Sequence, residues 1–219
     1  MNTALRTLYD SKWPDLNRIL GEDKSISRPL LLKVPPEYEF AATRLLVIGQ
    51  QTKGWGDHPE ESDVRPVLHL MELYERFAFA LNYPASPFWQ ASHELYRRLN
   101  PGAPPRGFLW SNLVKVDQDE RRPAGEIEEQ VCQLGLVPAE VEIVRPRVVV
   151  FFTGRPYDAR LSSTFAATRF FPLSNHLARL EHPALPFHTY RSPHPNWLRR
   201  SGNWDVLSEL AQEVLGRPA

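Results

Sequence analysis

Cysteine is almost absent from this sequence of 219 residues, and its scarcity excludes several kinds of site. The single cysteine, Cys132, rules out an internal disulfide, a zinc knuckle and a four-cysteine iron–sulfur cluster. It lies among helix-forming residues in "EEQVCQLG", so we interpret it as a small buried apolar residue rather than a reactive thiol. Such cysteine usage is typical of the reducing cytosol, and we predict a cytoplasmic protein.

Long apolar runs and a net charge are missing as well. No segment approaches the roughly 18 uninterrupted apolar residues of a membrane span, and the amino terminus lacks the apolar region of a signal peptide. The 26 basic residues balance the 26 acidic ones, so no overall field draws the chain to nucleic acid or to an acidic membrane. We therefore expect no membrane partner, and any site for a polyanion must be local.

Proline, by contrast, is abundant, and the 21 prolines indicate many firmly shaped loops. The hydrophobic fraction of 42% and the length are ordinary for a globular unit that buries a core. No repeat, low-complexity tract or linker divides the chain. We predict a single, monomeric domain over residues 1–219, with residues 1–43 as a partly helical amino-terminal extension packed on it.

Segments with strand and helix patterns alternate along the chain. Strands that are apolar on both faces and alternate with helices predict a three-layer α/β/α fold around a central, mostly parallel sheet. The predicted helices of this fold are residues 67–81, 88–99, 124–135, 136–145 and 199–216. The predicted strands are residues 44–50, 107–116, 147–154, 169–173 and 186–190.

Polar residues follow or interrupt four of these strands. In open α/β sheets the ligand crevice lies beyond the carboxyl ends of the strands, so we expect these residues to meet in space. They are Gln50 with Gln51, Gly154 with Arg155, Ser192 with His194, and Asn112 inside an otherwise apolar run.

Four motifs in order, "VIGQQ", "LWSNLVKV", "RPRVVVFFTG" and "SPHPN", resemble the uracil-DNA glycosylase superfamily. The resemblance covers the chain from about residue 44 to its carboxyl end. It implies a uracil-DNA glycosylase-like fold. The implied activity is a hydrolase that cleaves the N-glycosidic bond of uracil or a related damaged base in DNA repair. Such an enzyme flips the base out of DNA and needs no metal and no cofactor.

The resemblance assigns roles to the residues of the expected crevice. Asn112 takes the place of the asparagine that reads the N3–H and O4 edge of uracil, with its amide as acceptor and donor. His194, on a turn stiffened by two prolines, donates to the negative charge that develops on the base oxygen. Gln50 is expected against the base, and Trp55 or a phenylalanine of "ERFAFAL" is expected to stack on it.

The first motif departs from the family pattern. The water-activating loop of the family carries an aspartate or asparagine closely followed by proline, whereas this chain has Gln51, Thr52 and Lys53. Gln51 is the residue in place to orient the water, yet a glutamine amide neither takes a proton nor opposes the positive charge on the sugar. Asp57 and His58 are candidates for the missing group.

Members of the superfamily also pinch phosphates with small residues and push an apolar wedge into the base stack. By that resemblance Gly154 and Ser192 approach the DNA backbone, and either Trp197 or Leu198 is the wedge. The basic residues expected on flanking phosphates are Arg155, Arg191, Arg199 and Arg200.

Other interpretations remain open at this point. In these interpretations His194 only hydrogen-bonds a backbone carbonyl in a tight turn, and Asn112 only caps a turn. Arg199 and Arg200 are then a solvated pair at the start of a helix. The chain is then a catalytically weak or inactive superfamily member that binds nucleic acid or a nucleobase without cleavage. An unrelated hydrolase or transferase for a small phosphorylated substrate is a third possibility, but the sequence lacks a phosphate-cradling glycine loop and a G-x-S-x-G elbow.

Overall fold

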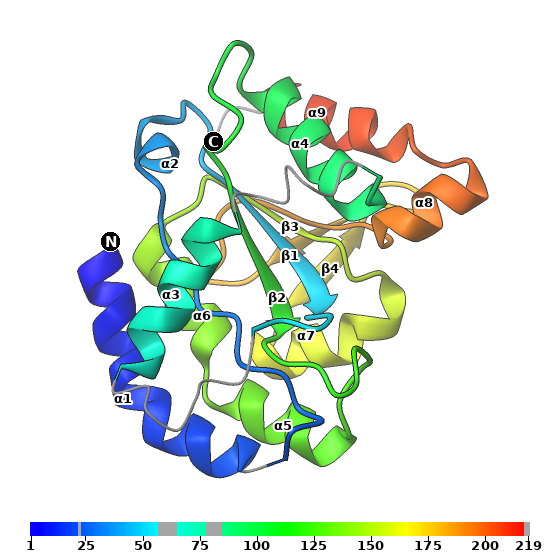
Figure 1. Cartoon of the computed structure of the whole chain (residues 1–219). Coiled ribbons are helices and arrows are strands. Elements are labelled where there is room, and N and C mark those ends of the chain that lie inside the picture. The colour runs from blue at the N-terminus through cyan, green and yellow to red at the C-terminus, as the bar shows by residue number, and fades with distance from the viewer. Residues whose placement is uncertain (22, 57–64, 78–84, 217–219) are drawn as a thin grey trace.

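The computed structural model describes residues 1–21, 23–56, 65–77 and 85–216, and they form an α/β protein (Figure 1). Its centre is a six-strand, mostly parallel sheet with the order β2-β1-β3-β6-β5-β4. Helices flank this sheet. The strands are β1 Leu45–Gln51, β2 Leu109–Val114, β3 Val148–Phe151, β4 Arg169–Pro172, β5 Ala178–Glu181 and β6 His188–Arg191.

The four parallel strands explain why the polar motifs come together. β1 pairs with β2 on one side and with β3 on the other, and β3 pairs with β6, all in parallel. The carboxyl ends of these strands therefore lie at one edge of the sheet, and Gly49 of β1 is in register with Asn112 of β2. β4 and β5 complete the sheet as an antiparallel pair beyond β6.

Two groups of helices lie on either side of the strands (Figure 1). Helix α4 contacts α8 and α9, whereas α1 contacts α3, α5 and α6. The long helices are α1 Asn2–Leu20, α3 Pro66–Arg76, α4 Pro87–Leu99 and α9 Val206–Gly216. The shorter ones are α2 Pro36–Phe40, α5 Gly125–Gln133, α6 Leu136–Val144, the 3₁₀ turn η2 Arg155–Tyr157, α7 Asp158–Thr164 and α8 Pro195–Ser201. Within the described ranges, no helix is both long and apolar enough to cross a membrane.

Helix α1 and the segment after it make buried polar contacts with α6 and with the residue that follows β2. The hydroxyl of Tyr9 in α1 donates to Glu140 Oε1 of α6 at 2.7 Å, and the buried Lys115 beyond β2 lies 2.5 Å from Glu140 Oε2. The Tyr9 oxygen also accepts the backbone N–H of Leu32 at 2.9 Å. Buried polar contacts thus join α1, the segment after it and the body of the sheet.

The structure corrects the prediction for the end of the chain. Residues 199–216 do not form one helix, because α8 begins at Pro195 and ends at Ser201, where Gly202 with a φ of 73° caps it before α9. Arg199 and Arg200 therefore lie in the last turn of α8, not at its start. Cations are favourable there, since the carboxyl end of a helix carries negative partial charge. The predicted strands are present, whereas β5 and α7 were not predicted.

Candidate functional site

A pocket of about 480 Å³ lies at the carboxyl ends of β1 and β2. Five aromatic side chains line it. Its polar side chains come from the ends of β1 and β2, from the segments that follow these strands, and from the residues before α4 and α8. The aromatic lining is Trp55, Phe77, Phe88, Trp89 and Trp110, and the polar lining includes Gln50, Gln51, Asn112, Glu120 and His194. An aromatic lining with a few amide and imidazole groups suits a planar ligand that has both hydrogen-bond donors and acceptors.

Asn112 reaches the pocket from the middle of β2. Its neighbour across the strand pair is Gly49, and a Cβ at that position would lie 2.4 Å from Asn112 Oδ1. Glycine at position 49 is thus required by the close approach of the amide. Asn112 is only 6% exposed, and its amide has no hydrogen-bond partner within the described part of the chain. Because the amide lines the pocket and has no protein partner, it is available to a ligand or to water.

His194 lines the same pocket as the residue that precedes α8. Its Nδ1 accepts the backbone N–H of Asn196 at 3.2 Å, so Nε2 carries the proton of the neutral ring. Burial, reinforced by the positive charge of Arg200, lowers the pKa of His194 to about 4. The imidazole is therefore neutral near pH 7. Nδ1 thus caps α8 by accepting a backbone N–H, not by bonding a backbone carbonyl, and Nε2–H is left as a donor.

Phe88, at the start of α4, is one of the pocket residues that the sequence did not reveal. Its ring is nearly parallel to that of His194, at an interplanar angle of 22° and a centroid distance of 6.0 Å. A Cβ on Gly49 would lie 3.2 Å from Phe88 Cε2, so the ring covers the same strand end as Asn112. Phe88 belongs to no motif, and its role depends on how α4 packs over β1.

Trp55 and Phe77, two of the candidates for stacking, both line the pocket. Their rings meet edge to face, with centroids 5.4 Å apart, and Trp110 makes a similar contact with Trp55 at 5.2 Å. The indole Nε1 atoms of Trp55 and Trp110 are buried and have no partner in the described residues. The aromatic wall thus contains two further donors.

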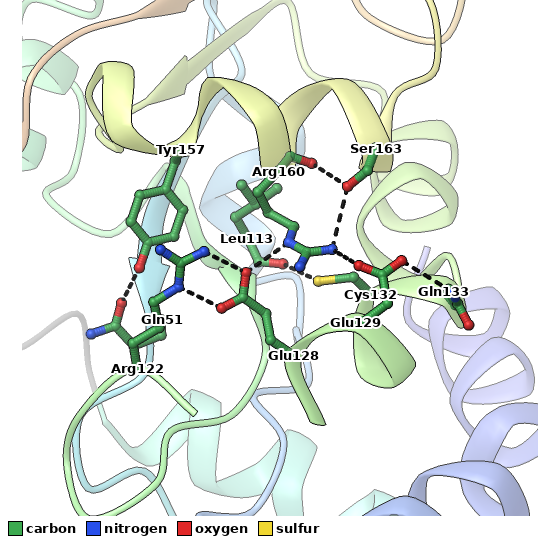
Figure 2. A network of polar contacts seen from close by, with 10 residues as sticks. All are labelled: Gln51, Leu113, Arg122, Glu128, Glu129, Cys132, Gln133, Tyr157, Arg160 and Ser163. Atoms are coloured by element: carbon green, nitrogen blue, oxygen red, sulfur yellow. Dashed lines mark hydrogen bonds and ion pairs between the residues drawn. The ribbon is translucent and has the colours of Figure 1, made fainter. Parts of the chain in front are cut away.

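The two glutamines at the end of β1 have different partners. Gln50 Nε2 donates to the carbonyl of Thr153 at 2.9 Å and so ties β1 to the end of β3. Gln51 Oε1 accepts the hydroxyl of Tyr157 at 2.7 Å (Figure 2). The carbonyl oxygen of Gln51 is therefore engaged, and its amide NH₂ remains. An NH₂ group can hold a water as donor, but it does not draw a proton from that water.

Figure 2 shows the polar network that holds Tyr157. The guanidinium of Arg122 lies 4.5 Å from the centre of the Tyr157 ring and makes a two-pronged contact with Glu128 at 2.5 and 2.7 Å. Arg160 bonds the same carboxylate at 2.7 Å. Burial opposes ionisation, but hydrogen bonds from Arg122 and Arg160 hold the pKa of Glu128 below its usual value.

Cys132 lies beside this network, and its thiol is 3.8 Å from the carbonyl oxygen of Leu113 (Figure 2). The residue is half-buried rather than fully buried. Burial raises the pKa of its thiol to about 11. The thiol is thus protonated at neutral pH, as expected of an unreactive cysteine.

A second pocket, of about 380 Å³, adjoins the first and shares Gln50 and His194 with it. Its lining includes Gly154, Arg155 and Trp197 from the predicted DNA-binding set. Trp197 is 40% exposed, and Arg155 donates to the carbonyl of Asn175 at 3.2 Å. An exposed indole and an arginine thus border the pocket that opens beside His194.

Three other residues of the predicted DNA-binding surface are buried. Leu198 has no exposed surface, so it is unavailable as a wedge and Trp197 is the one of the pair that reaches solvent. Ser192 is also fully buried, and its Oγ donates to the carbonyl of Pro193 at 3.2 Å. Arg191 is 5% exposed and paired with Asp158 at 3.1 Å, so it does not extend a solvated rim.

Arg199 and Arg200 are exposed at the end of α8. The Arg199 guanidinium stacks over Trp204 at 5.0 Å and donates to the side chain of Gln90 on α4. Asp57 and His58, the sequence candidates for a water-activating group, lie outside the described residues. So does Phe79, the second phenylalanine of "ERFAFAL". No group of three metal-ligating side chains occurs in the ranges that the structure describes.

Comparison with known proteins gives this arrangement no family name. No protein-family model matches the chain. No curated protein matches its sequence either.

Proposed function

We propose that this chain is a DNA base-excision glycosylase with a uracil-DNA glycosylase-like, three-layer fold. It hydrolyses the N-glycosidic bond of uracil or a related damaged base. The observation that carries the proposal is the unpartnered amide of Asn112, 6% exposed, in a pocket with aromatic walls. An amide at that depth pairs with the edge of a base, and the aromatic rings stack on its faces.

The chemistry of bond cleavage fits the neutral His194. Negative charge develops on the base oxygen as the bond to the sugar breaks, and a fixed N–H donor stabilises that charge. Nδ1 of His194 is occupied by the Asn196 N–H, which orients the ring and leaves Nε2–H as the donor. The nearly parallel ring of Phe88 beside His194 supports a planar ligand between the α4 helix and the strand ends.

The adjoining pocket supports DNA as the carrier of the base. A base that enters the first pocket from a strand leaves its neighbouring sugar and phosphate near His194, where the second pocket begins. Trp197 is exposed there and is the candidate wedge in the base stack, and Arg155 is the candidate phosphate contact.

The alternative is a protein that binds the base or the nucleic acid without cleaving it. The Tyr157 hydroxyl holds Gln51 at the end of β1, and Gln51 favours this alternative, because an amide does not take a proton from water. In this alternative Asn112 and His194 keep their roles in recognition.

A strand-cleavage assay separates the two functions. Purified protein is incubated with fluorescent single- and double-stranded oligonucleotides that each carry one uracil, hypoxanthine or mismatched thymine, and alkali then cuts abasic sites. We expect cleavage, and losses of about 100-fold or more in Asn112→Ala and in His194→Ala. Gln130→Ala removes an amide of α5 outside the pocket and is the matched control. Binding in a gel shift without cleavage would support the alternative instead.

A further inference from the structure

The described lining of the aromatic pocket contains a single carboxylate, that of Glu120. Glu120 follows β2 in the loop that begins at Asp117. Its side chain is 66% exposed and lies 4.0 Å from the ammonium of Lys53, which also lines the pocket. A Cβ on Gly54 would lie 3.5 Å from Glu120 Cγ, so the stem of the side chain packs on the loop after β1.

The backbone at Glu120 is unusual for its residue type. Asp119 has a φ of 49° and Glu120 a φ of 60°, two successive positive values outside glycine. Gln118 and Arg121 exchange backbone hydrogen bonds at 3.0 and 2.9 Å across them. This is the pattern of a type I′ turn, whose second central position favours glycine. A glutamate in that position costs stability, and such strain occurs preferentially where a side chain has a function.

Neighbouring groups hold the turn in place. Asp117 Oδ1 accepts the N–H of Glu120 at 3.0 Å, and Asp117 Oδ2 accepts the N–H of Trp55 at 3.5 Å. The N–H of Asp119 donates to the carbonyl of Ser25 at 2.8 Å. The same buried aspartate thus fixes both the turn that carries Glu120 and the aromatic wall of the pocket.

We propose that Glu120 is the carboxylate of the hydrolytic reaction, an inference that rests on the proposed function. The water oxygen forms a bond to the anomeric carbon of the sugar while the bond from that carbon to the base nitrogen breaks. One water proton goes to the Glu120 carboxylate, and the bonding electron pair leaves with the base. The base departs as an anion hydrogen-bonded to His194 Nε2–H and is then protonated, and Glu120 releases its proton to solvent. The negative charge of Glu120 also stabilises the positive charge that develops on the sugar.

Substitutions at the turn test the role of Glu120, with single-turnover cleavage of a uracil oligonucleotide as the readout. Glu120→Gln keeps the shape of the side chain and removes its basicity, so we expect the rate to fall by about 100-fold or more with oligonucleotide binding unchanged. Asp119→Asn, in the adjacent position, is the matched control and should keep the wild-type rate. Glu120→Gly should be as stable as the wild type or melt at a higher temperature, since glycine suits the turn. If the role of Glu120 were purely structural, Glu120→Gly should instead melt at a lower temperature than the wild type. Added formate should restore part of the rate of Glu120→Gly.

The outcomes distinguish this inference from the proposed function. Cleavage by the wild type with an equally active Glu120→Gln variant would overturn the role of Glu120 and leave the glycosylase proposal standing. If Asp57→Asn then lost the activity, Asp57 rather than Glu120 would be the group that takes the proton from the water. No cleavage by the wild type of any of the three lesions would overturn both.

Discussion

At the scale of single residues, His194 combines a structural and a chemical role. Nδ1 caps α8 by accepting the N–H of Asn196, which leaves Nε2 protonated and directed by a fixed ring. Burial, with a contribution from Arg200, lowers the pKa of the ring to about 4. A neutral imidazole donates a hydrogen bond without placing a full charge in the aromatic pocket, where a charge is poorly solvated.

The low pKa of His194 predicts how stability depends on pH. An unfolded histidine takes up its proton near pH 6.5, whereas folded His194 does so near pH 4, so the unfolded state binds more protons between these values. The free energy of unfolding should therefore fall as the pH is lowered through this window, by up to about 3 kcal/mol from this group. Urea unfolding of the wild type and His194→Ala at pH 7 and pH 4.5 measures the difference. Equal pH dependence in both proteins would contradict the assignment.

The sequence identified only part of the pocket. Asn112 and His194 stand out locally, since one interrupts an apolar strand and the other lies between two prolines. Phe88 and Glu120 give no such signal. The position of Phe88 depends on how α4 packs, and that of Glu120 on a turn type that the sequence Asp-Glu does not indicate. The sequence did not decide whether Trp197 or Leu198 is the candidate wedge, since they are neighbours. The structure decides it, because Leu198 is buried and Trp197 is exposed.

At the scale of elements, one carboxylate links three segments that support the loop of Gln51. Glu128 of α5 is bonded by Arg122 from the preceding loop and by Arg160 of α7 (Figure 2). Arg122 in turn lies over the ring of Tyr157, whose hydroxyl holds Gln51. The position of Gln51 at the pocket therefore depends on the α5–α7 contact as well as on β1.

Replacing Glu128 should loosen this contact. Glu128→Gln leaves two guanidinium groups without their shared charge partner, one of them on the largely buried Arg160, and we expect a loss of about 2 to 3 kcal/mol in the free energy of unfolding. Glu129→Gln, which removes an exposed carboxylate bonded to the same Arg160, is the control and should have a much smaller effect. Chemical unfolding at pH 7 compares the two variants. A similar loss in both would show that Glu128 has no special role.

Element types could be read from the sequence where apolar patterns are long and continuous, as in β1 and β3. The patterns failed for β5 and for the boundary between α8 and α9. β5 has only four residues, buried at alternate positions, and its polar residues hide it. The split between α8 and α9 depends on Gly202 with positive φ, a residue that the helical periodicity on both sides obscured.

At the scale of the whole molecule, a buried polar cluster joins the amino-terminal extension to the sheet. Glu140 of α6 accepts hydrogen bonds from Tyr9 of α1 and from Lys115, and Lys115 donates to Ser111 of β2 at 2.6 Å. Burial lowers the pKa of Lys115 and raises that of Glu140, although each partner favours the charged form of the other. Ser111 precedes Asn112, so the cluster and the pocket amide lie on the two faces of the same strand.

This cluster predicts that the extension and the sheet unfold together. Tyr9→Phe removes a donor to a buried carboxylate and leaves the N–H of Leu32 without its acceptor, which should cost about 1 to 3 kcal/mol. Thr7→Ala removes a hydroxyl of the same helix that bonds only within its own turn, and it should change stability by less than about 0.5 kcal/mol. Tryptophan fluorescence and far-ultraviolet circular dichroism, followed in urea, should give one coincident transition in all three proteins, with the midpoint lowered only in Tyr9→Phe. Two separated transitions would instead make residues 1–43 an independent unit, in which case losing the Tyr9 hydroxyl would leave the pocket around Asn112 intact.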